Sequence, residues 1–239
     1  MKKILSVALA ILLVSTVFAQ TKKDWSKEVM DRAGDHFMVQ FGVNNWAGTP
    51  DSISSRIKGF SRGVNVAVMM NKPFKTDPRW SVALGLGISN SSVFFENTSI
   101  DLKSSSTLLP FRNLDSSDRF KKYKLATTFA EVPIELRYTF DPVNQKKSWK
   151  IAVGVKVGTM INAHTKGKTL QNKNNSTINA YTEKITKRTF FNGTRLAATA
   201  RVGIGNFSLF GSYAITALIK DVAGAAIRPY QIGLCVSGL

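Results

Sequence analysis

The sequence has little cysteine and histidine, and this limits the disulfides, metal sites and catalytic sites that the chain can form. Cys235 is the single cysteine among 239 residues, which excludes an internal disulfide framework and a cysteine-based metal site. His36 and His164 are the 2 histidines, and the sequence has no Gly-x-Ser-x-Gly, phosphate-loop or zinc-ligand spacing. We therefore expect no enzymatic activity, no cofactor and no bound metal. An enzyme that modifies membrane lipid through His164 is the remaining catalytic alternative.

Long apolar runs are missing beyond the N-terminus, so no transmembrane helix is expected there. The start of the chain is basic at Lys2 and Lys3, continues with an apolar stretch, and reaches small residues at Ala19. This pattern predicts a secretory signal peptide over residues 1–19 that is cleaved after export. An uncleaved helix is the alternative, but the apolar run is shorter than the roughly 20 residues that span a bilayer.

Residues 20–35 follow the predicted cleavage point and are expected to form a periplasmic N-terminal segment. Trp25, Val29 and Met30 could line one side of a short helix, and a disordered leader is an equal alternative. The remaining residues, 36–239, are numerous enough for one barrel or sandwich domain.

Strict alternation in residues 80–89 indicates the fold. Large apolar side chains such as Leu84 and Leu86 occupy one face of this strand, and Ala83, Gly85 and Gly87 occupy the other. A soluble strand usually shows charged or polar side chains to water, whereas this second face carries almost no side chain. Lipid outside and a narrow lumen inside would explain both faces, as in a membrane β-barrel.

The same alternation predicts eight antiparallel strands, an even number as bacterial outer-membrane barrels require. Most are long enough to cross a bilayer at a tilt. Their expected ranges are 36–45, 60–71, 80–95, 125–140, 149–163, 191–204, 207–219 and 229–238.

Short and long connections alternate along these strands. Residues 72–78, 141–148 and 205–206 make short turns, whereas residues 96–123 and 166–189 are long, polar and basic. Outer-membrane barrels have short periplasmic turns and long extracellular loops. The aromatic residues beside the short turns then form a periplasmic girdle: Trp80, Tyr138, Phe140, Trp149 and Phe207.

Charged residues share the inward face of three strands and predict an ionic network in the lumen. Unpaired charges in a narrow barrel would cost several kcal/mol, so these side chains must pair. Structural filling is the preferred interpretation, and a gate or proton path is the alternative. The residues are Glu131, Glu135, Arg137, Lys156, Arg195 and Arg201.

The segment Ala130-Glu131-Val132-Pro133-Ile134-Glu135-Leu136-Arg137-Tyr138 resembles a strand of the PorT-like outer-membrane β-barrel proteins of Bacteroidetes. The lysine-opened leader and glycine-alternating strands extend the resemblance, while Leu239 replaces the aromatic residue common at the end of such chains. The resemblance implies an eight-stranded outer-membrane barrel. It also offers an accessory role in protein secretion as an alternative function.

Basic residues exceed acidic ones by 33 to 15, which favours an anionic neighbour. Nucleic acid is excluded for an exported chain, so outer-membrane lipid and lipopolysaccharide are the expected partners, with protein partners at the membrane also open. Charge that merely seats the barrel in an anionic leaflet is the alternative to specific binding. The candidate contacts for an anionic glycan are Lys166, Lys168, Lys184, Lys187 and Arg188.

A secreted lipocalin-like barrel is the alternative to a membrane barrel. Its apolar face would point inward, and Ala83, Gly85 and Gly154 would then expose bare backbone to water, which weakens strands. The sequence therefore favours a small outer-membrane barrel with a structural or surface-interaction role.

Overall fold

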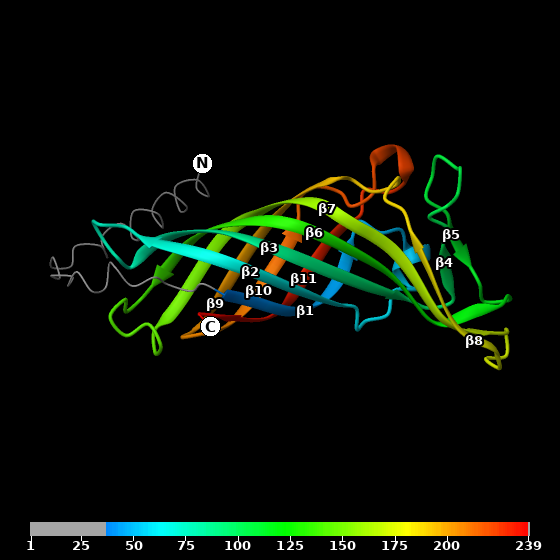
Figure 1. Cartoon of the computed structure of the whole chain (residues 1–239), viewed down its shortest axis with the longest axis horizontal. Helices are drawn as coiled ribbons and strands as arrows, with labels where there is room; N and C mark the ends of the chain where they lie inside the picture. Colours follow the sequence, from blue (N-terminus) through cyan, green and yellow to red (C-terminus); the bar gives the residue numbers. More distant parts are fainter. Residues whose placement is uncertain (1–36, 239) are drawn as a thin grey trace, which may run out of the picture.

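A computed structural model describes residues 37–238, which form a closed antiparallel barrel (Figure 1). Residues 1–36, which hold the expected signal peptide, the segment 20–35 and His36, lie outside the described residues, as does Leu239. The barrel strands are β1 (Phe37–Ala47), β2 (Arg62–Pro73), β3 (Trp80–Phe95), β6 (Arg119–Thr139), β7 (Trp149–Gln171), β9 (Thr194–Ile204), β10 (Phe207–Ala214) and β11 (Arg228–Ser237).

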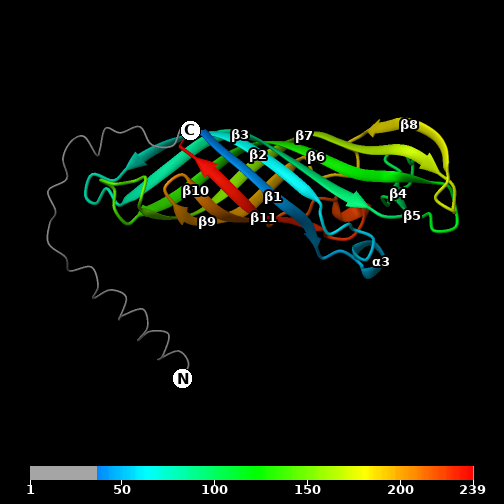
Figure 2. The same cartoon turned by 90° about the horizontal axis from the view of Figure 1, so that it is seen from below.

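The strands follow one another around the barrel in the order β6-β3-β2-β1-β11-β10-β9-β7, and pairing between β6 and β7 closes the ring. Figure 2 shows β11, β1, β2 and β3 side by side across one wall. Closure leaves no free edge in the ring itself. The predicted eight-stranded antiparallel barrel is confirmed.

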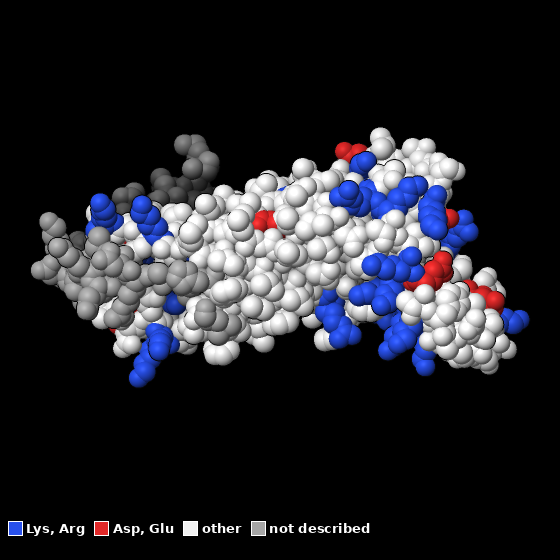
Figure 3. Space-filling view, in the orientation of Figure 1, with Lys and Arg blue, Asp and Glu red and all other residues white. Residues whose placement is uncertain are grey.

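The two faces of each strand differ as the alternation predicted. In β3, Leu86 is 71% exposed on the outside, while Ala83 is fully buried inside. On the face that Figure 3 shows, a band almost free of charge crosses the middle of the barrel, between two ends that carry lysine and arginine. Such an apolar outer band is what the hydrocarbon of a bilayer contacts.

Short turns close one end of the barrel. Residues 74–79, 140–148 and 205–206 connect β2 to β3, β6 to β7, and β9 to β10. Gly205 has a φ of 61°, a backbone conformation that glycine adopts without steric cost and that suits a tight hairpin. Nearby, the rings of Trp80 and Tyr138 lie 4.9 Å apart and those of Tyr138 and Phe140 5.1 Å apart.

The other end carries the long connections, as Figure 1 shows. A four-residue helix, α3 (Asp51–Ser54), lies between β1 and β2, and a small hairpin of β4 (Thr98–Ile100) and β5 (Phe111–Asn113) lies between β3 and β6. A single-turn helix, η2 (Asp221–Ala223), precedes β11. We assign this end to the extracellular side because outer-membrane barrels place their long loops there.

The expected extent of several strands was wrong. β6 begins at Arg119 rather than 125, β7 continues to Gln171 rather than 163, and residues expected as loop form β8 (Thr177–Thr186). Backbone pairing of β6, β7 and β8 continues past the barrel rim because apolar side chains pack beneath it, among them Tyr123, Leu125 and Ile185. We call this part of the sheet, residues 119–126, 162–171 and 177–186, the β6–β7–β8 extension.

The strand expected over 207–219 ends earlier, at Ala214. Beyond it the chain leaves the ladder, and Asn192 Nδ2 donates hydrogen bonds to the carbonyl oxygens of Ala217 at 2.8 Å and Ile219 at 3.2 Å. Phe191, expected in a strand, forms only an isolated bridge with Ile219. These contacts hold the loops together in place of strand pairing.

A β-bulge lies in β7 where the extension begins. Phe129 pairs with Met160 and Thr128 with Asn162, so Ile161 is the extra residue. Outward positions are odd-numbered below the bulge, as at Val157, and even-numbered above it, as at Lys166. Ile161 and Asn162 both lie on the outer side of the bulge, so the parity of the outward positions changes there.

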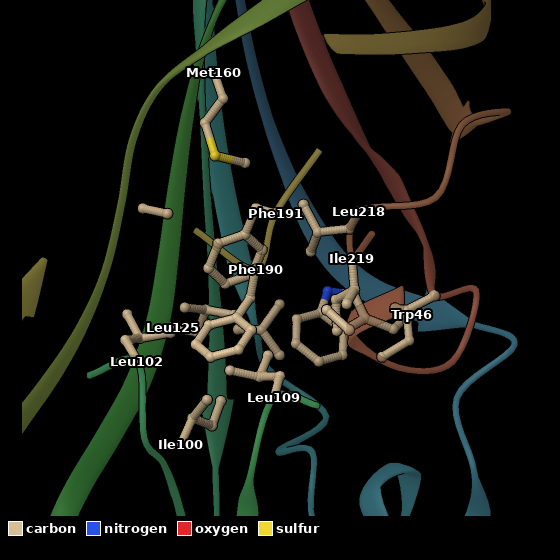
Figure 4. Packing of buried hydrophobic residues seen from close by; sticks show 14 of the residues in the cluster. Trp46, Ile100, Leu102, Leu109, Leu125, Met160, Phe190, Phe191, Leu218 and Ile219 are labelled. Atoms are coloured by element: carbon tan, nitrogen blue, oxygen red, sulfur yellow. The ribbon is translucent and has the colours of Figure 1, made fainter. Parts of the chain in front are cut away.

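Apolar side chains from the strands and the four long connections fill the extracellular end of the barrel (Figure 4). Trp46 packs edge-on against Phe95, with ring centroids 5.4 Å apart. Loop residues that point inward complete this cluster, which we call the apolar plug; they include Leu102, Leu109, Phe190, Phe191, Leu218 and Ile219. Within residues 37–238, no helix has the length and apolarity needed to cross a membrane.

Candidate functional site

Three of the predicted lumen residues meet at Glu135 in the periplasmic half of the barrel. Arg137 Nε donates to Glu135 Oε2 at 2.9 Å, and Arg201 Nη2 donates to the same oxygen at 2.9 Å. Arg137 and Arg201 both pair with Ala152 of β7, whose small side chain leaves room for the two guanidinium groups. All three charged side chains are buried, so this cluster is an ion triad shielded from water.

A second ion pair lies further toward the extracellular side. Arg195 Nη2 lies 2.9 Å from Glu131 Oε1, and the guanidinium also stacks 4.9 Å from the ring centroid of Phe129. Gly158 pairs with both Glu131 and Arg195. A Cβ at Gly158 would lie 2.9 Å from Glu131 Cγ, so glycine provides the space that the ion pair occupies.

Lys156 lies between the two ionic groups and has a neutral partner. Its Nζ donates to Gln40 Oε1 at 2.9 Å and lies 5.9 Å from the ring centroid of Phe210. Asn65 Nδ2 donates to the same Gln40 oxygen at 3.1 Å and to Gln231 Oε1 at 2.9 Å. Ser89 Oγ donates to Asn65 Oδ1 at 2.8 Å, which extends the chain of hydrogen bonds to β3.

Sequence reasoning missed these amide residues because it considered charge alone. Gln40, Asn65 and Gln231 each stand between large apolar residues, at positions that alternation places inside the barrel. An amide at an inward position was the available signal. The lumen is consequently filled by two ionic groups and an amide network below the apolar plug, which leaves little space for a pore.

The five residues predicted to contact a glycan do not form one cluster. Lys166 pairs directly with Lys124 of β6 on one side and with Lys184 of β8 on the other. Lys168 pairs with Lys122 one step further from the barrel. Paired residues share a face of a sheet. The outer face of the β6–β7–β8 extension therefore carries five lysines together: Lys122, Lys124, Lys166, Lys168 and Lys184. Lysine and arginine side chains are prominent at this end of the molecule in Figure 3.

Arg188 and Lys187 lie beside this row of lysines. Arg188 Nη1 donates to the carbonyl oxygens of Met160 at 2.8 Å and Ile161 at 3.3 Å, so its guanidinium binds the backbone of the bulge. The backbone N–H of Lys187 donates to the carbonyl of Ala163 at 3.2 Å. The geometry therefore gives Arg188 a structural partner and leaves three of the predicted residues, Lys166, Lys168 and Lys184, on the basic face.

An ion pair joins two extracellular loops. Arg56 Nη2 and Nη1 donate to the two carboxylate oxygens of Asp115 at 2.6 and 3.0 Å, and Asn97 Nδ2 donates to Oδ1 at 2.9 Å. The hydrogen bonds from Arg56, and then from Asn97, hold the pKa of Asp115 well below its usual range. The loop carrying α3 is thus attached to the loop carrying β4 and β5.

His164 lies on the β6–β7–β8 extension, where its Nδ1 is 3.3 Å from Asn162 Nδ2. His36 is outside the described residues, so the structure does not place the two histidines relative to each other. In residues 37–238, no three side chains of His, Cys, Asp or Glu gather closely enough to hold a metal ion.

Comparison with known proteins bears on the family of the chain. The family described as "Outer membrane protein beta-barrel domain" matches residues 18–219. Among solved structures, two of Ail, the attachment invasion locus protein of Yersinia pestis, are similar. One has 12% identity and a TM-score of 0.38; the other, in complex with the heparin analogue sucrose octasulfate, has 13% identity and a TM-score of 0.40. Each alignment covers 86% of this chain and 97% of Ail. No curated protein matches at a significant level. The family match spans most of the sequence, and the chain belongs to the outer membrane protein beta-barrel domain family.

Proposed function

We propose that this protein is a closed, non-enzymatic outer-membrane barrel with a surface-interaction role, and that it binds anionic glycans on the outer face of the β6–β7–β8 extension. In this proposal residues 1–19 direct export and are removed, and residues 20–35 lie in the periplasm. Glu131, Glu135, Arg137, Lys156, Arg195 and Arg201 act as structural filling of the lumen.

One observation carries the glycan proposal: Lys166 lies between Lys124 and Lys184 in direct register. Like charges directly opposite in a sheet are destabilising, so three lysines in one row are a cost to the free protein. Negative groups of a polymer would remove that repulsion and accept charge-assisted hydrogen bonds. Lipopolysaccharide and acidic polysaccharides present such groups at the cell surface.

The resemblance to PorT-like proteins does not favour a secretion role. The charged residues of the segment that carries this resemblance are Glu131, Glu135 and Arg137, and these residues form ion pairs in the lumen. The shared strand is therefore explained by barrel construction. We propose that the chain is related to the PorT-like proteins through this strand, and we derive no activity from that relationship.

The glycan proposal is tested by binding of fluorescent dextran sulfate to the full chain in detergent. A triple variant, Lys166→Glu, Lys168→Glu and Lys184→Glu, is expected to lose binding. The matched control places the same charge change at the periplasmic end, through Lys72→Glu, Lys75→Glu and Lys146→Glu, and is expected to retain it. Equal binding by the two variants, or equal binding of uncharged dextran, would show that the extension is not a glycan site.

A band shift that requires boiling on a cold detergent gel checks that each variant still forms a closed barrel. Recovery of the wild-type protein in the wash fraction without detergent, with no such shift, would remove the membrane assignment on which the proposal rests.

A further inference from the structure

A pair of cations interrupts the apolar outer surface at the extracellular rim of the barrel. From Met70 to Val64 the outward residues of β2 are apolar, and the next outward position is Arg62. Lys124 occupies the corresponding level on β6. Register connects the two through β3, because Arg62 pairs with Ser92 and Lys124 pairs with Phe94. Both cations therefore lie outside the barrel, where the hydrocarbon layer would end.

Aromatic rings and one hydroxyl hold the two cations in place. The Arg62 guanidinium lies 5.4 Å from the ring centroid of Phe60 and 5.5 Å from that of Phe94. Lys124 Nζ lies 5.6 Å from the same Phe94 ring and donates to Ser92 Oγ at 3.1 Å. Both cations thus contact one ring, and cation–π contacts of this kind fix a charge without neutralising it.

Neither cation has an acidic partner among residues 37–238, whose ion pairs involve other basic side chains. Two fixed positive charges near the low dielectric of a membrane are more strongly repulsive than in water. An anion that lies between the two cations and accepts hydrogen bonds from both would relieve this repulsion. Phosphate suits the position, since a guanidinium donates two parallel hydrogen bonds to it and an ammonium adds a third.

An apolar groove runs down the outer surface beside the cations, with Arg62 and Lys124 among the residues that line it. Its aliphatic and aromatic lining comes from β1, β2, β3 and β11 and from Phe60 just before β2, and it includes Phe41, Val64, Phe94, Ile232 and Leu234. Phe41 is 55% exposed and Leu234 63% exposed on this face. These strands form the wall seen in Figure 2. In a bilayer the groove would be covered by an acyl chain.

We propose that Arg62 and Lys124 bind the phosphate of a phosphorylated glycolipid in the outer leaflet, whose acyl chain lies in the groove below. One molecule must carry both chemistries, since the cations and the groove adjoin. A soluble polyanion fits only the upper half of this site. The site shares Lys124 with the row of lysines on the β6–β7–β8 extension but uses neither Lys166, Lys168 nor Lys184. It does not rest on the glycan proposal; it rests on the barrel's place in the membrane.

The test uses the full chain in phosphatidylcholine vesicles that contain a small fraction of bisphosphorylated lipid A, followed by native mass spectrometry of the extracted protein. Wild type is expected to retain lipid A about tenfold or more above its dephosphorylated form, given the strength of charge-assisted hydrogen bonds. Arg62→Gln with Lys124→Gln is expected to abolish this preference. The control, Lys72→Gln with Lys75→Gln, should keep it.

A third variant separates this site from the glycan face. Lys166→Gln with Lys184→Gln is expected to weaken dextran sulfate binding and to leave lipid A retention unchanged. The lipid site is refuted if dephosphorylated lipid A is retained equally by wild type, or if Arg62→Gln with Lys124→Gln binds lipid A as wild type does. Loss of the boiling-dependent gel shift in that variant would direct the same measurement to Arg62→Gln alone, with the same two outcomes.

Discussion

Arg201 of β9 reaches across β7 to Glu135 of β6, with Nη2 and Oε2 2.9 Å apart. The two residues are not on adjacent strands, and Ala152 and Gly154 of β7 are small enough for the side chains to meet. The lumen is therefore stabilised by contacts between strands that share no backbone hydrogen bonds.

Glu135→Gln is expected to lower the free energy of unfolding by about 3–5 kcal/mol, because it leaves two buried guanidinium groups without their shared carboxylate. Urea titration in detergent, followed by tryptophan fluorescence, measures this change. Glu96→Gln, an exposed substitution, should stay within about 0.5 kcal/mol of wild type. Equal stability of Glu135→Gln and wild type would show that the triad contributes nothing.

Gly154→Ala is expected to destabilise the barrel by about 1–3 kcal/mol. A Cβ at this position would collide with the backbone carbonyl of Ile134 and lie 2.9 Å from Glu135 Cα. Gly211→Ala is the matched control within a strand, because a Cβ at Gly211 would have no neighbouring heavy atom within 4 Å. The same urea titration compares them, and equal losses would contradict the role of close packing at Gly154.

Lys184→Glu is expected to stabilise the β6–β7–β8 extension by about 0.2–1 kcal/mol, since it replaces a repulsive cross-strand pair with Lys166 by an attractive one. Slower amide hydrogen exchange in β8 measures this effect. The same variant should weaken dextran sulfate binding. Faster exchange would mean that the lysine row does not repel, and would remove the main support for the glycan proposal.

The attachment between loops depends on pH through Asp115. Because its folded pKa is lowered by Arg56, its contribution to loop order is fully present above the ordinary pKa of 3.8 and is lost as pH falls through the folded value. Carbon-13 NMR of the carboxyl group is expected to show titration below 3.8 in wild type. In Arg56→Gln the pKa should rise toward the ordinary value. An unchanged titration in that variant would show that Arg56 is not the cause.

Stepwise conductance is not expected in planar bilayers, because the ionic groups and the apolar plug close the lumen at two levels. Glu135→Ala combined with Arg201→Ala removes part of the lower closure and should still give no steps, since the plug around Phe190 and Phe191 remains. Steps in wild type would overturn the interpretation of the lumen charges as filling.

Much of the barrel could be predicted because membrane strands obey a simple alternation. Leu84 and Leu86 face outward and Ala83 inward, as the pattern in residues 80–89 required. The inward parity of Glu135, Arg137 and Arg201 followed from the same period. Their partners could not be predicted, because inter-strand register depends on the whole ring.

Other features depend on tertiary contacts that leave weak traces in the sequence. The bulge at Ile161 is visible only once β6 pairs with β7, and β8 is a polar strand held by one neighbour. Arg62 was missed because alternation assigns it to the lipid face, where a cation is unexpected, and Lys124 because it lies just before the strand expected over 125–140. The importance of these two cations depends on their height along the barrel axis relative to the membrane boundary, and the period of the sequence gives no information on that height.

The bulge at Ile161 sets which side chains of the β6–β7–β8 extension face outward, separately from the alternation in the barrel below it. If Ile161 were instead accommodated in a strand without the bulge, uninterrupted alternation would turn His164, Lys166 and Lys168 toward the plug and Ala163, Thr165 and Gly167 outward. Deleting Ile161 would remove the bulge and leave these side chains on their present faces. The bulge thus decides whether the extension presents a charged exterior or a bare one, without altering any strand within the membrane.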